Sequence, residues 1–354
     1  MRTQRTAIAL PLAAGMLVAG LAVTSTRLPA QGCEPIRFTT PVSLGGEGET
    51  YQTSRQWRLT LAYRRLFSNE FFVGTSENPA KGPSGESPVF RINTMVANVA
   101  YAVNDRVRLS LSVPYSSGSF TRKWPDAKYH TQSVSGLGDV NFSGDLWLLN
   151  PRKHQGGNLA LGLGVKAPTG SNDKVSRVYT ATSSSEYPAD QPIQPGDGGW
   201  GFTLQTQGFL QVQERTFLYA GGSYMASPRD KSNIRQTPTG AYWSVPDVYS
   251  GRAGAAFSLF PDLGLSVSLG GRIDGIPVHD LIGGGDDVTV KRSAYVILAD
   301  PGLSLTRGGN NLTLSVPIRM MVNRQKSVLE QNTNGTNGGG FAKYLIYASY
   351  SYRL

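Results

Sequence analysis

The sequence has few of the residues from which metal centres and disulfide frameworks are built. It contains one cysteine and three histidines in 354 residues. A lone cysteine cannot form an intrachain disulfide, and three scattered histidines offer little for a zinc cluster. We therefore expect no metal site, no other cofactor and no disulfide framework.

Charge and long apolar runs are also scarce. Charged residues make up 16% of the chain, against about 25% in an average protein, which argues against a highly charged disordered chain. The interior of the chain holds no apolar run of about 18 residues, which excludes a bundle of membrane-spanning helices. Glycine is abundant, with 42 residues, but without the Gly-X-Y period of collagen. What remains is a glycine-rich and aromatic-rich chain that we expect to be all β.

The N-terminus has the pattern of a secretory signal peptide. Arg2 and Arg5 precede an apolar stretch, residues 6–23, and small and polar residues follow as far as Ala30. This pattern predicts a signal peptide over residues 1–32 and export from the cytoplasm. A membrane anchor is the alternative, although Pro11 interrupts the stretch.

Cleavage would leave a basic mature chain that starts at a cysteine. Removal of residues 1–32 takes away three arginines and no acids, which leaves 31 basic and 24 acidic residues and a net charge of +7. Residues 30–33 match a lipoprotein acylation site poorly, so lipidation of Cys33 stays open. The sequence contains no compact run of basic residues, so we do not expect it to bind nucleic acid.

Period-two alternation of apolar and polar residues dominates the mature chain. Trp57, Leu59, Leu61 and Tyr63, for example, alternate with polar or small residues, as in strands with one apolar face. Many such runs reach the roughly 9–11 residues that a tilted strand needs to cross a bilayer. We expect twelve strands, near residues 55–68, 89–103, 106–116, 137–149, 158–168, 200–213, 216–226, 246–260, 263–273, 292–306, 311–323 and 341–354.

The connections between these strands alternate between short and long. Short joints are expected at 104–105, 150–157, 214–215, 261–262 and 307–310, and long polar loops at 69–88, 117–136, 169–199, 227–245, 274–291 and 324–340. Such sidedness is typical of an up-and-down antiparallel transmembrane β-barrel, with short periplasmic turns and long extracellular loops. A soluble β-sandwich would show shorter strands and no sidedness. We therefore predict a signal peptide (1–32), a periplasmic N-terminal segment (33–54) and an outer-membrane barrel (55–354).

The N-terminal segment and the last strand bear on how such a barrel would work and assemble. Residues 33–54 show no clear pattern, and either a plug in the periplasmic mouth or a disordered lead-in fits them. The last strand alternates up to Leu354 and is rich in tyrosine. It resembles the signal read by the outer-membrane barrel assembly machinery, although phenylalanine is the usual last residue there. Outer-membrane lipid and lipopolysaccharide are the other expected partners.

One pair of segments resembles a known family. Gly136-Leu137-Gly138-Asp139 is followed some twenty residues later by Leu161-Gly162-Leu163-Gly164-Val165-Lys166-Ala167-Pro168-Thr169-Gly170. Over residues 136–170 this pairing resembles the outer-membrane transporter family associated with meta-pathway phenol degradation. The resemblance implies a barrel channel for aromatic or hydrophobic compounds.

Strand parity places several charged residues on the inward face. The resulting candidates for lumen lining and solute selectivity are Arg64, Asp139, Asp145, Lys166, Arg252, Arg272, Arg319 and Lys343. Cations outnumber acids among them, and in a narrow passage this excess of positive charge would favour the entry of anionic solutes. Parity also suggests an ion pair between Asp139 and Lys166, which would serve either selectivity or the bracing of their hairpin.

We predict a channel or transporter for small, aromatic or hydrophobic anionic solutes. The alternative is a structural or surface-binding barrel with an occluded lumen. We do not expect an enzyme, because the one adjacent acid–base pair, His279-Asp280, falls in a loop, and no serine accompanies a strand histidine at the spacing of a nucleophile and its base.

Overall fold

The structure is a computed structural model of the chain, and it describes residues 52, 54–78, 88–236, 240–283, 285–335 and 338–354. The expected signal peptide (1–32), Cys33 and nearly all of segment 33–54 lie outside the described residues.

The described chain forms a closed, twelve-stranded antiparallel barrel, as predicted. Closure comes from the pairing of the first strand with the last, in which Arg58 faces Arg353. The wall contains, in chain order, β1 (Trp57–Ser68), β4 (Val89–Ala102), β5 (Val107–Lys123), β7 (Val140–Trp147), β8 (Gly157–Ala167), β11 (Gly201–Gln213), β12 (Thr216–Ala226), β15 (Val248–Phe260), β16 (Leu265–Ile276), β18 (Ala294–Ala299) continued by β19 (Gly302–Arg307), β20 (Asn310–Ser315) continued by β21 (Ile318–Arg324), and β23 (Leu345–Arg353).

Two wall strands are interrupted at prolines. β18 gives way to β19 at Asp300-Pro301, and β20 to β21 at Val316-Pro317. Because proline has no backbone N–H, it cannot donate to the ladder. The predicted strands 292–306 and 311–323 are therefore present as two segments each.

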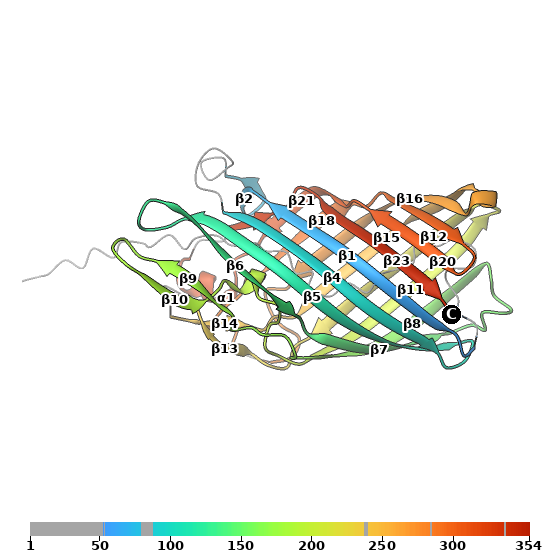
Figure 1. Cartoon of the computed structure of the whole chain (residues 1–354), viewed down its shortest axis with the longest axis horizontal. Coiled ribbons are helices and arrows are strands. Elements are labelled where there is room, and N and C mark those ends of the chain that lie inside the picture. Colours follow the sequence, from blue (N-terminus) through green and yellow to red (C-terminus); the bar gives the residue numbers. More distant parts are fainter. Residues whose placement is uncertain (1–51, 53, 79–87, 237–239, 284, 336–337) are drawn as a thin grey trace, which may run out of the picture.

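The two ends of the barrel differ as the loop lengths predict. Figure 1 shows tight connections and the C-terminus at one end, here called the short-turn end, and elaborate connections at the other, here called the long-loop end. One of the short joints is a single 3-10 turn, η3 (Pro261–Leu263). Gly264 closes it with φ at 69°, a conformation that glycine adopts without strain.

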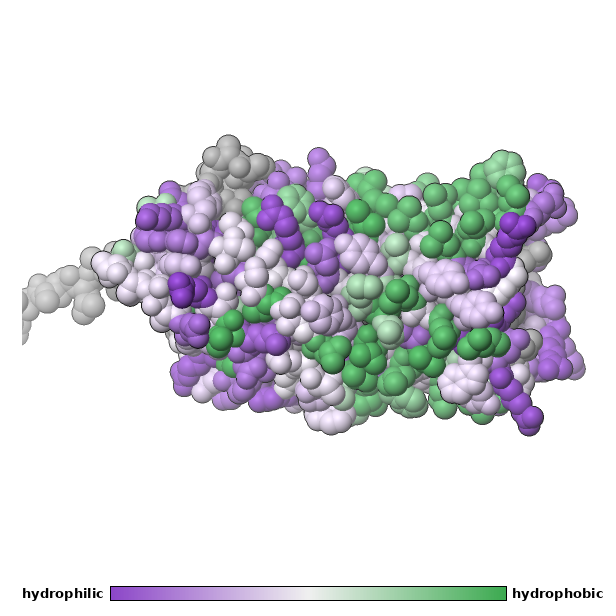
Figure 2. All heavy atoms as spheres, in the orientation of Figure 1, coloured by the Kyte–Doolittle hydropathy of each residue, from purple (hydrophilic) through white to green (hydrophobic). Residues whose placement is uncertain are grey.

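A band of apolar side chains surrounds the outside of the wall. Leu61, Leu163, Leu204 and Leu269 are between 50% and 71% exposed. On the face shown in Figure 2 the apolar surface forms a band across the strands, and both ends are hydrophilic. This is the outer surface that a bilayer requires of a barrel.

The prediction of a polar loop at 117–136 is wrong. β5 continues to Lys123, and β6 (Tyr129–Leu137) pairs with it in a hairpin. Serine and threonine alternate along this stretch, so its outer face is hydroxylated rather than apolar. The hairpin therefore extends the wall beyond the apolar band, where the sequence lacks the usual signal of a strand.

The other long connections also contain secondary structure. One small sheet joins β2 (Glu70–Val73), β3 (Ser76–Glu77) and β22 (Gly338–Phe341), and another joins β13 (Lys231–Arg235), β14 (Tyr242–Ser244) and β17 (Thr289–Val290). The remaining elements are a hairpin of β9 (Val175–Tyr179) and β10 (Ser184–Pro188), the 3-10 turn η2 (Gln191–Ile193), and the short helix α1 (Val328–Asn332). Ser327 and Glu330 form a capping box that starts α1. No helix in the described part of the chain is long and apolar enough to cross a membrane.

Candidate functional site

A polar cavity of about 140 Å³ lies inside the barrel. Ten wall strands contribute to its lining, which is mostly serine, threonine, glutamine and glycine. Its charged lining residues are Arg64, Arg108, Asp145, Arg252 and Arg272. Four of the eight predicted selectivity residues are therefore brought together here, and Arg108 of β5 joins them.

Three of the four arginines are paired with carboxylates. Arg108 contacts Asp145 at 2.8 Å, Arg252 contacts Asp300 at 3.2 Å, and Arg272 contacts Asp274 at 2.7 Å. Asp300 and Asp274 were not among the predicted selectivity residues. Asp300 lies at a strand break and Asp274 lies near a strand end, where alternation along the sequence is a weaker guide to which side chains point inward.

Arg64 differs from these three arginines. Its Nη2 donates to Thr94 Oγ1 at 3.3 Å, and no carboxylate of the described residues lies within ion-pair distance of it. Four arginines therefore face three carboxylates, and Arg64 carries the excess positive charge.

Glycine in β8 makes room for the Asp145 network. Gln205 Nε2 donates to Asp145 Oδ1 at 2.6 Å. A Cβ atom at Gly162 would lie only 2.6 Å from Gln205 Cγ and would also meet the Asp145 carboxylate. A Cβ at Gly164 would meet nothing closer than 3.4 Å. The two glycines of β8 thus differ, since its neighbours require a glycine at position 162 but not at position 164.

An apolar cluster fills the lumen between the polar cavity and the long-loop end. Leu66 lies one inward position beyond Arg64 on β1, and the rings of Phe90 and Phe120 stack at 4.5 Å. The cluster consists of Leu66, Phe72, Phe90, Phe120, Val134, Ala189, Ile193, Ala294, Val296, Leu298, Val322, Phe341, Ala342 and Leu345. All of these side chains are at most 8% exposed, so the barrel is occluded at this level.

One member of the apolar cluster comes from a long connection rather than from the wall. Ile193 ends η2 and is 1% exposed. It lies directly against Gly118 of β5, where a Cβ would be 2.8 Å from Ile193 Cβ. The absence of a side chain at Gly118 therefore allows the connection between β10 and β11 to enter the lumen as a lid.

Charged and aromatic side chains lie above the apolar cluster. Arg292 contacts Asp190 at 3.2 Å and covers the ring of Trp243 at 4.3 Å. Arg122 covers the ring of Trp124 at 3.8 Å. Burial raises the pKa of Asp190 and lowers the pKa of Arg122. On the long-loop side of the apolar cluster, cations stacked on aromatic rings therefore line the way into the lumen.

The predicted ion pair between Asp139 and Lys166 is present and has a third member. Lys166 Nζ lies 3.5 Å from Asp139 Oδ2, and it also contacts both carboxylate oxygens of Asp197. Asp139 and Lys166 are 0% exposed and Asp197 is 6% exposed. Asp197 lies in the connection between β10 and β11, where no periodicity marks it as inward.

The glycines of the 136–170 motif allow two backbones to cross beside this ion cluster. Asp139 Oδ1 accepts a hydrogen bond from Gly170 N at 2.9 Å. A Cβ at Gly170 would lie 2.8 Å from the Cα of Gly138. In this structure the motif fastens the connection between β8 and β11 to the barrel rim.

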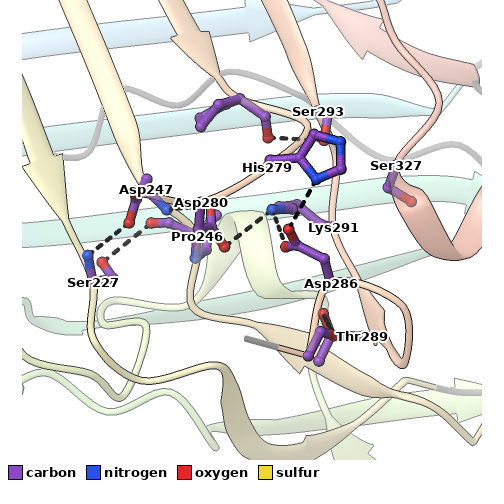
Figure 3. A network of polar contacts seen from close by, with 12 residues as sticks. Ser227, Pro246, Asp247, His279, Asp280, Asp286, Thr289, Lys291, Ser293 and Ser327 are labelled. Atoms are coloured by element: carbon purple, nitrogen blue, oxygen red, sulfur yellow. Dashed lines mark hydrogen bonds and ion pairs between the residues drawn. The ribbon is translucent and has the colours of Figure 1, made fainter. Parts of the chain in front are cut away.

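A second ion cluster fastens the connection between β16 and β18. Lys291 Nζ, fully buried, lies 3.0 Å from Asp280 Oδ2 and contacts Asp286 Oδ1 (Figure 3). Asp280 Oδ1 accepts from Asp247 N at 3.1 Å, and the Asp247 carboxylate accepts from Ser227 N and Leu281 N. Burial raises the pKa of Asp280 to about 6.

Two further predicted site residues lie outside the polar cavity. Arg319 donates to the carbonyl oxygens of Phe341 and Ala342 at 3.1 Å and pairs with Glu70. Lys343 is exposed and precedes β23. Neither residue lines the cavity.

The histidine of the predicted acid–base pair has a different partner. His279 is 75% exposed, and its Nδ1 lies 3.6 Å from Asp286 (Figure 3). No hydrogen bond joins it to a serine hydroxyl in the described ranges. Nor do those ranges contain three or more histidine, cysteine or acidic side chains arranged to hold a metal ion.

Comparison with known proteins identifies the fold but no family. Neither a protein-family model nor a curated protein matches the sequence. The structure is similar to the COG4313 outer membrane channel from Pseudomonas putida F1, with a TM-score of 0.59 and 13% identity over 87% of this chain and 98% of that chain. The CymD monoaromatic hydrocarbon channel (TM-score 0.45, 8% identity, 91% of this chain and 98% of that chain) is also similar. The translocator domain of the autotransporter NalP from Neisseria meningitidis is similar as well, with a TM-score of 0.44 and 12% identity over 86% of this chain and 90% of that chain. These last two likenesses are too weak to support a further conclusion.

Proposed function

We propose that this chain is an outer-membrane channel for small hydrophobic or aromatic solutes and that it prefers anions. The single observation that carries the proposal is a lumen with two chemically different halves inside an apolar outer band. The apolar cluster suits the hydrocarbon part of a solute, and the arginines of the polar cavity suit a carboxylate or phenolate.

The sidedness of the barrel gives the proposed path a direction. Long loops belong to the cell exterior in barrels of this kind. A solute from outside would pass the stacked cations, displace the Ile193 lid, cross the apolar cluster and reach the polar cavity. The resemblance over residues 136–170 also supports aromatic solutes, and the phenol-degradation link stays a prediction.

Arg64 is the residue on which the anion preference depends most. The other three cavity arginines have carboxylate partners, which offset their charge. Four predicted candidates remain, namely Asp139, Lys166, Arg319 and Lys343. We also propose that they influence access to the lumen at the rim of the barrel and do not set selectivity inside it. We assign transport rather than catalysis.

Ion selectivity in a planar bilayer tests this proposal. In a KCl gradient we expect a reversal potential that indicates anion preference, a shift towards no preference in Arg64→Gln, and retention in Arg64→Lys, which keeps the charge. Swelling of proteoliposomes should be faster in benzoate than in benzylammonium, an aromatic cation of similar size. Cation preference in the wild-type protein would refute the anionic part of the proposal.

The filled outer half of the lumen favours one alternative. A barrel that stays closed could use its loops to bind surface partners. Such a barrel would show no conductance in the bilayer and no swelling with any solute, so the same two measurements distinguish the functions.

A further inference from the structure

Two arginines project from the outside of the wall. In the pairing of β1 with β4, Arg65 faces Asn93 and Phe67 faces Arg91. Neighbouring residues of a strand point to opposite sides, and Arg64 points into the cavity. Arg65 and Arg91 are both exposed, so they share the outer face at diagonally adjacent positions.

Both arginines lie directly beyond the apolar band, on the side of the long loops. Along the outer face of β1, Leu59 and Leu61 are 43% and 50% exposed, and Tyr63 and Arg65 follow. On β4 the 45% exposed Met95 is followed by Asn93 and Arg91. In a membrane this level corresponds to the head groups of the outer leaflet.

The surroundings of the two arginines offer hydrogen-bond donors. Across from β4, Asn93 faces Ser117 and Arg91 faces Ser119. Tyr63 Oη donates to Asn93 Oδ1 at 2.7 Å. The Asn93 carbonyl oxygen is thereby occupied, and its NH₂ group remains a donor at the outer face.

Among the described residues, this surface has no acceptor of matching charge. No carboxylate of the described residues forms an ion pair with Arg65 or Arg91. The guanidinium of Arg91 lies over the ring of Phe67 at 5.4 Å. Two like charges on diagonal positions, typically about 7–8 Å apart, repel each other unless an anion lies between them.

We propose that Arg65 and Arg91, with Asn93 and Ser117 and Ser119 beside them, bind the phosphate groups of lipid A in the outer leaflet. The assignment rests on the proposed outer-membrane location. A guanidinium can give a phosphate two parallel hydrogen bonds, and the serine hydroxyls and the amide supply neutral donors. Lipid A fits this level, because its acyl chains would lie along the apolar band below.

Lipid binding to the purified full chain in non-ionic detergent tests the site. Native mass spectrometry would compare bisphosphorylated lipid A with the same lipid after removal of its phosphates. The variants are Arg65→Gln, Arg91→Gln and their combination. Arg307→Gln, an exposed arginine at the short-turn end, serves as the matched control. Heat-modifiable migration on gels confirms that each variant is folded.

We expect the wild-type protein to prefer phosphorylated lipid A and each glutamine to weaken binding by about tenfold, as for the loss of a charge-assisted hydrogen bond. Arg307→Gln should bind as the wild type does. Equal binding of both lipids, unchanged binding in the double variant, or displacement of lipid A by millimolar inorganic phosphate would each overturn the assignment. No solute crosses the barrel in this experiment, so failure of the channel proposal and failure of the lipid site are distinguishable.

Discussion

Ile193, in the connection between β10 and β11, packs directly on Gly118 of β5, within the apolar cluster that occludes the lumen. The contact joins a loop to the inner wall and leaves no room for a side chain on the wall. It therefore identifies a place where a single added carbon atom should disturb the packing that occludes the lumen.

Gly118→Ala should displace the Ile193 lid and raise conductance. The added Cβ would lie 2.8 Å from Ile193 Cβ and 3.0 Å from its Cα, so the lid backbone must move. Single-channel recording should show a larger or more frequent open state. Gly271→Ala is the matched control, because a Cβ at that strand position meets nothing within 4 Å. Identical recordings from both variants would contradict the lid.

Lys166→Met should loosen the connection between β8 and β11. It leaves Asp139 and Asp197 buried without their cation, which typically costs about 3–5 kcal/mol. Limited proteolysis should then cut within residues 168–200 while the barrel stays intact. Lys153→Met, in an exposed short turn, should have no such effect. Adding Asp197→Asn to Lys166→Met should restore part of the protection, because it removes one uncompensated charge.

The connection held by Lys291 should become more stable as the pH falls through about 6. The pKa of Asp280 is raised from 3.8 to about 6 by burial, so the folded loop binds a proton between these values that the unfolded loop does not. Its stability therefore rises as the pH falls from about 7 to about 4 and is constant below. The protection factor of the Asp247 amide, which donates to Asp280, should rise over this range; as a ratio to the intrinsic rate, it excludes the slowing that every amide shows as the pH falls.

The pH effect can be assigned to one carboxylate by substitution. Asp280→Asn should remove the dependence, whereas Asp287→Asn, an exposed residue of the same connection, should preserve it. A wild-type profile that is flat between pH 4 and 7 would argue against Asp280 as the titrating group.

Gly162→Ala should disturb the polar cavity. The new methyl group would overlap Gln205 and push it and Asp145 towards the lumen. Overpacking of this kind costs about 1–3 kcal/mol, and the variant should show a lower unfolding midpoint in denaturant and a smaller conductance. Gly164→Ala, whose Cβ would make only ordinary contacts, should resemble the wild type. Equal midpoints for the two variants would contradict the requirement for glycine at 162.

Much of the barrel wall could be predicted because its signals are local. A strand with one face in lipid and one in the lumen must alternate in polarity, and that alternation is readable in segments such as residues 57–63 and 107–115. It also placed Arg64, Asp145, Arg252 and Arg272 on the inward face. The wall beyond the apolar band was missed, because the hydroxyl-rich stretch 117–136 lies beyond the level of the acyl chains and therefore shows no apolar alternation.

The sequence by itself determined the twelve alternating strands, the sidedness of their connections and four of the charged residues that line the cavity. Alternation follows from neighbours along one strand, and sidedness follows from the lengths of the connections. Only the tertiary structure decided which cations are neutralised and what closes the lumen. Asp197 reaches Lys166, Asp300 reaches Arg252, and Ile193 reaches Gly118 across separations that no periodicity records. Arg64 and Arg65 illustrate both contributions. Alternation alone sets them on opposite faces. Only the folded wall shows that Arg64 has no carboxylate partner among the described residues and that Arg65 lies beside Arg91 at the edge of the apolar band.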